Sequence, residues 1–508
     1  MRQDNEMATQ QQVTGIETLE PSAVWSLFAQ VAEIPRPSRK EERIRNRVRE
    51  IAEAHGLTTR SDTVGNLVID VPASPGCESA PLTVLQAHFD MVCEKNASCT
   101  HNFDEDPISL IIDTDAATGE PIVRADGTTL GADNGIGLCM ALAAAITPEV
   151  VHGPLELLIT MDEESGMTGA KALTPDSFKG RRLLNLDSEE DDILYIGCAG
   201  GSDCVLSWSL QTAAPPKEGE RCRIEVTGLR GGHSGCDIHE NRGNAIKLLV
   251  RTLLHAHPEN LHLAAIDGGQ IRNAIPREAS ATVIGPSGTL DMLRQSAANV
   301  QKEASRESHE GNVSIRASAS TADSSHVLSI EDSWRIISAL SALPHGVIGM
   351  HPKVPGLVET SNNVASIKLD VGDSPQTVRV QIANLARSSS ESRKKAALAQ
   401  IAAVGRLAGA DVKISGDYPG WEPNPDSELL VTCRRIYADL FGEEPKVAAI
   451  HAGLECGLIG ERVGGMDMIS FGPNIKGAHS PDERVEINSV KKSWKYLVAV
   501  LAELSRGE

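Results

Sequence analysis

Five segments of the sequence each place a side chain that can bind a metal ion at the end of an apolar run or in the turn beside one. These side chains are two imidazoles and three carboxylates, namely His88, Asp133, Glu164, Asp187 and His479. In open α/β sheets, ligand sites form at the carboxyl ends of the strands, so the shared placement favours one common site. A mixed set of nitrogen and oxygen ligands suits zinc, and also manganese or cobalt. The pattern therefore predicts a metal site.

The segment LQAHFDMV places His88 and Asp90 two residues apart on an expected strand, so both side chains point to the same face. A carboxylate beside an imidazole can hold the second ring nitrogen and fix the tautomer that binds metal. Each segment also has an ordinary structural interpretation. Asp133 could be a helix N-cap, and a single histidine such as His479, one of 15 in the chain, is more often structural.

Three acidic residues, Asp162, Glu163 and Glu164, directly follow the apolar run LELLITM. Adjacent carboxylates repel one another unless positive charge lies nearby. Solvated surface acids are the ordinary alternative, although such acids seldom follow so apolar a strand immediately. Because neighbouring residues point in different directions, one glutamate could bind a metal ion while the other transfers protons.

Short apolar runs alternate with helical patterns in the first part of the chain. Strands are expected within 81–90, 154–164 and 182–187, and a helix within 134–146. This β-α-β order predicts an α/β domain whose central sheet is mostly parallel and flanked by helices. The continuous apolar character of LELLIT is typical of a central strand that is covered on both faces.

The pattern changes after about residue 200, where short alternating strands are interleaved with helices. That mixture predicts an α+β domain with an antiparallel sheet. After about residue 413 the first pattern returns. We therefore expect a discontinuous domain that carries the metal site, interrupted by a second, inserted domain. The boundaries that we expect are a flexible N-terminal tail at 1–20, the first domain at 21–200 and 414–508, and the inserted domain at 201–413.

Taken in order along the chain, these motifs resemble those of the zinc-dependent aminoacylase, carboxypeptidase and dipeptidase superfamily. More closely, the chain resembles the aminoacyl-histidine dipeptidases, also called Xaa-His or cytosol non-specific dipeptidases, from about residue 20 to the end. The most specific segments are LQAHFDMVCEK, TTLGADNGIG, MDEESGMTGA, NLDSEE, GCAGG, GLRGGHSGCDIHENRGNA, GGQIRNAIPREA, IHAGLECG and SFGPNIKGAHSPDE. The discontinuous domain would then be catalytic, and the inserted domain would be its lid.

The resemblance implies two zinc ions per subunit, with cobalt or manganese as alternatives. Asp133 would bridge the two ions. His88 and Asp187 would complete one site, and Glu164 and His479 would complete the other.

The resemblance also implies roles for residues that surround the ions. Asp90 would orient the imidazole of His88. Glu163 would be the general base, which takes a proton from the attacking water and returns it to the leaving amine. In the superfamily a cis peptide bond typically follows the bridging acid, which here would join Asp133 to Asn134.

The inserted domain is expected to close the site and to supply substrate contacts. His233 in GGHSG matches a superfamily histidine that stabilises the oxyanion formed from the reacting carbonyl. In dimeric relatives this histidine comes from the partner subunit. Without the resemblance, GGHSG would be interpreted as a glycine-rich turn with an incidental histidine. Arg387 is the expected ligand of the substrate carboxylate, because arginine binds carboxylates bidentately. Arg272 and Asn273 are rivals, and Asn273 is expected rather to support the active-site side of the lid. Glu455 either meets the substrate amino group or serves the structure.

The activity that these roles imply is hydrolysis of dipeptides, including Xaa-His and β-alanyl-histidine types, with broad specificity. One alternative is another amide hydrolase with the same metal centre: an aminoacylase, a tripeptidase or a carboxypeptidase. The other alternative is a non-catalytic binding protein on the same fold. In such a protein, a metal-ligand residue or the general base should have been lost from the sequence. All five ligand positions and Glu163 carry competent residues, which favours an enzyme. A homodimer formed through the inserted domain is also expected.

Composition excludes some partners. The net charge of -21 argues against nucleic acid and anionic membranes, because both require a basic surface. The ten cysteines form no CxxC pair, and several lie in apolar runs, which favours buried thiols in a reducing compartment over a disulfide framework. The polar N-terminal segment lacks the apolar core of a signal peptide, and no apolar run approaches the ~18 residues of a membrane span. We expect a cytoplasmic protein that acts on small peptides.

Overall fold

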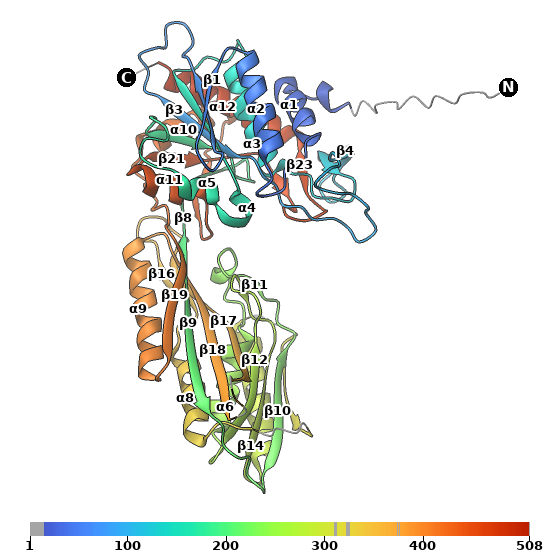
Figure 1. Cartoon of the computed structure of the whole chain (residues 1–508), viewed down its shortest axis with the longest axis vertical. Helices are drawn as coiled ribbons and strands as arrows, with labels where there is room; N and C mark the ends of the chain where they lie inside the picture. Colours follow the sequence, from blue (N-terminus) through green and yellow to red (C-terminus); the bar gives the residue numbers. More distant parts are fainter. Residues whose placement is uncertain (1–14, 309–311, 322–325, 373, 375, 507–508) are drawn as a thin grey trace, which may run out of the picture. The chain divides into compact units, whose positions relative to one another are not determined.

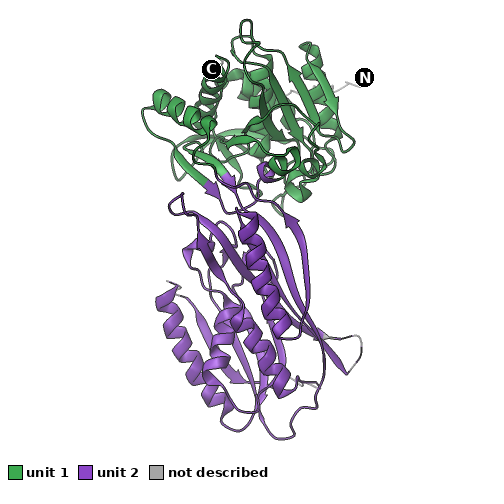
Figure 2. Cartoon of the chain, turned by 90° about the vertical axis from the view of Figure 1, so that its left-hand side faces the viewer, with its two compact units in different colours: residues 1–196, 424–448, 458–508 green, residues 197–423, 449–457 purple. Residues whose placement is uncertain are grey.

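The structure, a computed structural model, describes residues 15–308, 312–321, 326–372, 374 and 376–506 of the chain (Figure 1). The chain forms two compact units, which are coloured green and purple in Figure 2. Unit 1 comprises the chain up to residue 196 together with 424–448 and 458–508, and unit 2 comprises 197–423 and 449–457.

Unit 1 contains an eight-stranded sheet whose four central strands run parallel. The order of strands is β1 (Thr58–Ser61), β2 (Leu67–Val71), β6 (Leu155–Thr160), β3 (Thr83–His88), β7 (Arg182–Asn185), β21 (Asp467–Ser470), β8 (Ile193–Cys198) and β20 (Lys446–Ile450). Every residue of β3 and β6 is buried, as expected for central strands made of continuous apolar runs. Antiparallel pairs lie towards the edges of the sheet, between β1 and β2, β2 and β6, and β8 and β21.

Helices cover this sheet and complete the first hydrophobic core (Figure 1). The longer ones are α1 (Ser22–Ala32), α2 (Glu42–Ala54), α3 (Ala132–Ile146), α10 (Glu428–Phe441) and α12 (Ile487–Leu504). The α3 helix is buried almost throughout, because its apolar residues surround the whole helix instead of forming one stripe. Shorter helices are α4 (Glu163–Gly166), α5 (Thr168–Ala172) and α11 (Glu455–Val463), and a small sheet has the order β22 (Ile475–Lys476), β23 (Arg484–Glu486), β5 (Pro121–Ala125) and β4 (Leu110–Thr114).

Unit 2 is built on a nine-stranded sheet in which all the described pairings are antiparallel. Its order is β15 (Ser314–Ala319), β10 (Glu220–Thr227), β14 (Ala279–Gly285), β12 (His262–Gly268), β17 (Val358–Val371), β18 (Thr377–Ser388), β9 (Gly200–Gln211) and β19 (Asp411–Tyr418), and β16 (Gly346–Met350) also pairs with β17. Strand β10 alternates between buried and exposed residues, the period expected of a sheet with one covered face. The helices of this unit are α6 (Ala245–Ala256), α7 (Thr289–Glu307), α8 (Ile330–Ala342) and α9 (Glu391–Leu407). The predicted fold class, a mostly parallel α/β domain with an inserted antiparallel α+β domain, is confirmed.

The unit boundaries lie close to the expected ones but differ in detail. The second boundary falls at 423/424 instead of 413/414, because β19 adds to the edge of the unit 2 sheet by pairing with β9. Residues 449–457 also belong to unit 2, where the N–H of Ala199 donates to the carbonyls of Ile450 and Ala452. The N-terminal tail expected at 1–20 is too long: residues 1–14 lie outside the described part of the chain, whereas Ile16 is fully buried in the first core.

Two further expectations concern the cysteines and membrane-spanning helices. All ten cysteines lie in the described part of the chain as thiols, and six of them are buried. Within the described residues, every helix is too short or too polar to cross a bilayer.

Candidate metal centre

The five predicted ligands lie together in unit 1, at the carboxyl ends of neighbouring strands. His88 is the last residue of β3, and Asp187 follows β7, which pairs with β3 in parallel. Glu164 follows β6 on the other side of β3, and Asp133 lies at the start of α3. His479 lies in the loop between β22 and β23. The parallel register of the strands is what brings residues so distant in the sequence to one edge of the sheet.

Asp133 lies between two histidines, with one carboxylate oxygen facing each. His88 Nε2 lies 3.3 Å from Asp133 Oδ1 and 3.2 Å from Asp187 Oδ1. His479 Nε2 lies 3.2 Å from Asp133 Oδ2 and 3.1 Å from Glu164 Oε2. The five residues thus form two groups of three that share Asp133, and within each group the potential ligand atoms lie within 4.8 Å of one another. This is the division of ligands that the family resemblance implies.

Two buried carboxylate oxygens in this cluster are poorly supplied with hydrogen-bond donors. Glu164 Oε1 is buried, and no group in the described part of the chain donates a hydrogen bond to it. Asp187 Oδ1 is also buried, and His88 Nε2, which lies 3.2 Å away, has one hydrogen to share between Asp187 and Asp133. Buried carboxylate oxygens normally have donors or bind cations, so these atoms fit metal ligands.

The electrostatics of the cluster also fit cations. Burial raises the pKa of Asp187, and the charges of Asp133 and Glu164 raise it further against the opposing effect of His88. Burial and the charge of Asp133 raise the pKa of the neighbouring Glu189 to about 8. Hydrogen bonds with Asp133 and Glu164 raise the pKa of His479 to about 11. Divalent cations would neutralise this concentration of carboxylates and would free both imidazoles to act as ligands.

Asp90 is fully buried and connects the first histidine to the acidic segment. Its Oδ1 lies 3.3 Å from His88 Nδ1. Its two oxygens accept the backbone N–H groups of Glu163 at 3.0 Å and Glu164 at 3.1 Å, and Ser38 Oγ donates to it at 2.7 Å. Although burial opposes ionisation, the hydrogen bond and charge of His88 lower the pKa of Asp90 to about 2. A permanently charged Asp90 therefore holds both His88 and the backbone of the two glutamates.

Glu163 lies next to the ligands, and one of its carboxylate oxygens is within 4.8 Å of ligand atoms of His88 and Glu164. The peptide bond between Asp133 and Asn134 is cis, as the resemblance implies.

His233 lies in unit 2, in the short strand β11 (Gly232–His233), which pairs with β13 (Ala274–Ile275). Its Nδ1 accepts the backbone N–H groups of Gly235 at 3.3 Å and Cys236 at 3.0 Å. The neutral ring must therefore carry its hydrogen on Nε2. Burial and then the charge of Arg387 lower the pKa of His233, which keeps the ring neutral. The side chain is thus held as a hydrogen-bond donor through Nε2.

Arg387 lies on β18 of unit 2 and is 5% exposed. Its Nη1 donates to the hydroxyl of Tyr418 at 2.8 Å, whereas its Nε is buried and has no acceptor among the described residues. The rival Arg272 instead forms an ion pair with Asp203. The structure therefore favours Arg387 as the arginine with unused hydrogen-bonding capacity.

The two other predicted substrate residues also lie in unit 2. Asn273 is exposed, and its carbonyl accepts the N–H of Ser234 at 2.7 Å, directly beside His233. Asn363 Nδ2 holds the same turn through the carbonyls on either side of Asn273. Glu455 is fully buried at the first residue of α11.

One buried histidine near Arg387 is not among the residues predicted from the sequence. His451 is buried, and its Nε2 lies 2.7 Å from the hydroxyl of Ser361, which is the cross-strand partner of Arg387. Burial and the charge of Arg387 lower the pKa of His451 to about 3. The signal in the sequence is its position in IHAGLECG, one of the segments that carry the family resemblance.

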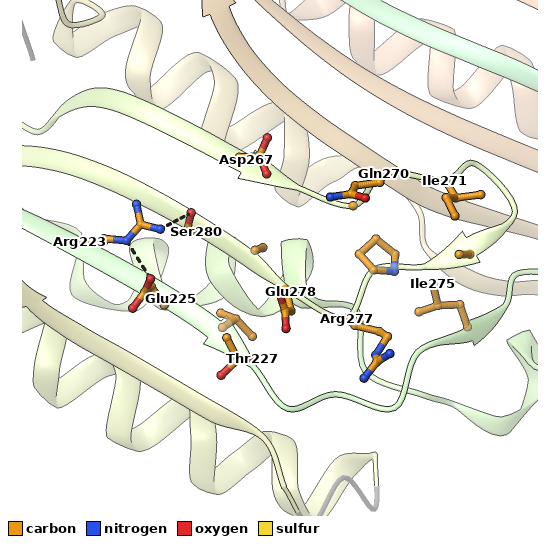
Figure 3. Close-up of a pocket in the computed structure, with 15 residues that line it drawn as sticks. Arg223, Glu225, Thr227, Asp267, Gln270, Ile271, Ile275, Arg277, Glu278 and Ser280 are labelled. Atoms are coloured by element: carbon orange, nitrogen blue, oxygen red, sulfur yellow. Dashed lines mark hydrogen bonds and ion pairs between the residues drawn. The ribbon is translucent and has the colours of Figure 1, made fainter. Parts of the chain in front are cut away.

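A separate cavity of about 650 Å³ lies over β10, β12 and β14 of unit 2 (Figure 3). None of the predicted site residues lines it. Its charged groups are partly paired with one another, since Arg223 bonds with Glu225 at 2.8 Å and with Ser280 at 3.2 Å. In the described part of the chain, none of the residues that line the cavity has a buried side-chain polar atom without a partner, whereas Glu164 of the metal cluster does.

Comparison with known proteins supports the interpretation of these motifs. The model of peptidase family M20/M25/M40 matches residues 84–503. The cytosol non-specific dipeptidase of Escherichia coli K12 is 41% identical over 493 residues, which cover 96% of this chain and 99% of that protein. The crystal structure of aminoacylhistidine dipeptidase from Vibrio alginolyticus is 42% identical, covers 96% of this chain and 98% of its own, and superposes with a TM-score of 0.87. Aminopeptidase PepT from Bacillus cereus ATCC 10987, at 17% identity and a TM-score of 0.60, shares the fold.

Proposed function

The chain belongs to peptidase family M20/M25/M40, and from this premise we propose that it is a metal-dependent dipeptidase. The observation that carries the proposal is the geometry of Asp133, whose two oxygens each face one histidine and join two ligand groups. Two relatives with more than 40% identity over nearly the whole chain are named dipeptidases. One of those names specifies aminoacyl-histidine substrates, so the substrates that we propose are Xaa-His dipeptides, including β-alanyl-histidine, within a broad range.

The five ligands His88, Asp133, Glu164, Asp187 and His479 would hold the ions, with zinc as the proposed metal and cobalt or manganese as substitutes. Two such cations would supply Lewis acidity to a water molecule and to the peptide carbonyl. Side chains of the protein would transfer the proton and orient the ligands. Glu163 takes the proton of the attacking water and returns it to the leaving amine, a transfer for which its place beside the ligands is suited. Asp90 keeps His88 in one orientation throughout.

Unit 2 would contribute the groups that recognise the substrate. His233, which carries its hydrogen on Nε2, would donate to the oxygen of the carbonyl as negative charge develops there. Arg387, oriented by Tyr418 and left with a buried Nε, would bind the terminal carboxylate. Asn273 would support the turn beside His233, and Glu455 would attract the ammonium group of the substrate. We further propose that the protein works in the cytosol, as the name of the E. coli relative indicates for that protein, and as a homodimer formed through unit 2.

The experiment that tests the proposal measures histidine release from alanyl-histidine and β-alanyl-histidine by metal-stripped protein, before and after addition of zinc, cobalt or manganese. We expect release only with metal, and renewed loss on addition of a chelator. A panel containing Ala-Ala, a tripeptide and an N-acetyl amino acid is assayed in parallel. Hydrolysis restricted to the tripeptide or the N-acetyl substrate would replace the dipeptidase by another amide hydrolase, and no hydrolysis with any metal would contradict a peptidase function.

A further inference from the structure

One buried carboxylate accepts hydrogen bonds from four successive backbone N–H groups in the loop that carries Asp133. Glu483 is 2% exposed and directly precedes β23. Its Oε2 accepts the N–H groups of Leu130 at 2.8 Å and Gly131 at 3.0 Å. Its Oε1 accepts those of Ala132 at 2.8 Å and Asp133 at 3.3 Å. The side chain therefore supplies acceptors to the first turn of α3, where backbone N–H groups have no partners within the helix.

A buried guanidinium holds the same loop from its carbonyl side. Arg36 is 3% exposed, and its Nη1 donates to the carbonyls of Phe89 at 2.8 Å and Asp90 at 2.9 Å. Its Nη2 donates to the carbonyl of Gly131. Arg36 thus ties the segment that follows His88 to the loop that precedes Asp133.

Among the described residues, Glu483 is the acceptor for all four of these N–H groups. No side chain within it caps α3, and Gly131 has a φ of 70°, a left-handed value that favours glycine. A Cβ on Gly131 would lie 2.5 Å from Arg36 Nη2 and 2.7 Å from Met91 Sδ, so a side chain would also displace the guanidinium. Glu483 and Arg36 thus contact both the N–H groups and a carbonyl of the loop that carries Asp133.

We propose that Glu483 and Arg36 are positioning residues that form the Asp133 loop in its ligating conformation before any metal arrives. The inference rests on the proposed role of Asp133 as the shared ligand. Glu483 is four residues from His479, so the same side chain also ties the loop of one ligand to the loop of the other. Both carboxylate oxygens of Glu483 and its negative charge are needed to hold the loop. In a glutamine, the amide group would direct its own N–H groups towards two of the four backbone donors.

The variant that tests the proposal is Glu483→Gln, compared with Glu156→Gln as a matched control. Glu156 is also a buried carboxylate of unit 1, and it accepts the N–H groups of Lys179 at 2.7 Å and Gly180 at 2.9 Å, but it bonds to none of the ligand segments. Metal-stripped proteins are titrated with Co²⁺ and followed by the visible absorption of the bound ion. We expect Co²⁺ affinity to fall roughly 10- to 100-fold in Glu483→Gln, with an altered spectrum, and to stay at the wild-type value in Glu156→Gln. Wild-type affinity and spectrum in Glu483→Gln would overturn the proposal.

A second measurement needs no variant and therefore decides the matter even if Glu483→Gln does not fold. Amide hydrogen exchange is recorded by mass spectrometry for peptides that contain residues 130–133 of the metal-stripped wild-type protein. We expect slow exchange without metal, because Glu483 already holds these four N–H groups. Fast exchange that becomes slow only with Co²⁺ would show that metal forms the loop, against the proposal. Slow exchange and tight Co²⁺ binding in a protein that hydrolyses no peptide would support this inference while contradicting the proposed function.

Discussion

The three adjacent acids at 162–164 have different surroundings although they are chemically alike. Asp162 is directed into the protein, where the hydroxyls of Ser165 and Thr168 donate to it. Glu164 faces His479 at 3.1 Å, and Glu163 lies near His88 and Glu164 without belonging to the two groups that share Asp133. These different surroundings are consistent with the different roles proposed for Glu163, as general base, and Glu164, as metal ligand.

Replacement of Glu163 by alanine should separate chemistry from metal binding. We expect turnover of a dipeptide to fall by roughly 10²- to 10⁴-fold, the usual contribution of a general base, with nearly unchanged metal content after dialysis. Steady-state kinetics and elemental analysis of the same preparation provide the check. Glu190→Gln is the control, because this exposed acid bonds with the hydroxyl of Tyr195 and should leave both quantities as in the wild type. Full turnover in Glu163→Ala would remove Glu163 from the mechanism.

The sequence could predict that the five proposed metal ligands lie together, because their residue types, their placement after apolar runs and the order of the motifs all agree. The contacts of Glu483 could not be predicted, although this residue lies in the recognised segment SFGPNIKGAHSPDE. Its four bonds are to backbone N–H groups about 350 residues away in the sequence. Such contacts leave no periodicity or residue pairing in the sequence, and they become visible only once the fold brings the two loops together.

Elements of unit 1 could be predicted closely because burial on both faces imposes continuous apolar runs. The runs at 81–90, 154–164 and 182–187 contain β3, β6 and β7, and the expected helix at 134–146 is α3 with two more residues at its start. The limits of unit 2 were harder to predict. Strand β19 pairs with β9, from which it is separated by some 200 residues, and this pairing carries the unit beyond residue 413. Long-range strand pairing is set by the folded sheet and has no local signal.

The turn that carries His233 is held by an ion pair, and this arrangement should matter for catalysis. Asp237 Oδ2 accepts the N–H of His233 at 2.7 Å, and Asp237 Oδ1 accepts a hydrogen bond from Arg242 at 2.9 Å. Asp237→Ala should therefore lower kcat by roughly 10- to 100-fold through misplacement of His233, without changing Co²⁺ affinity.

His233→Ala should lower kcat by roughly 10²- to 10³-fold, the usual effect of losing one oxyanion donor.

A double-mutant cycle tests whether Asp237 acts through His233. If it does, the double variant should be no slower than His233→Ala alone, because nothing remains for Asp237 to position. Asp291→Ala, which alters an exposed acid on α7 of the same unit, is the control for a general effect on the unit. Independent, multiplying losses in the double variant would show that Asp237 has a separate role.

On the scale of the whole molecule, the two units have separate hydrophobic cores. One core includes α3 and the central parallel strands, and the other includes α6, α7 and the antiparallel sheet. All five proposed metal ligands lie in unit 1, whereas His233 and Arg387, the proposed substrate contacts, lie in unit 2. If these roles hold, variants of unit 2 should leave the metal affinity of unit 1 intact.

Metal should stabilise unit 1 selectively, because a ligand that binds only a folded unit raises the free energy of unfolding of that unit. At a free metal concentration 100 times the Kd, each bound ion adds about 2.7 kcal/mol, and one ion alone shifts Tm by roughly 5–10 °C for a unit of this size. We expect calorimetry of the metal-stripped protein to show two transitions, of which addition of Zn²⁺ raises only one. Proteolysis at a temperature between the two transitions, with the surviving fragments identified by mass, should assign the metal-dependent transition to unit 1. Equal shifts of both transitions, or a shift confined to unit 2, would contradict a metal centre held wholly by unit 1.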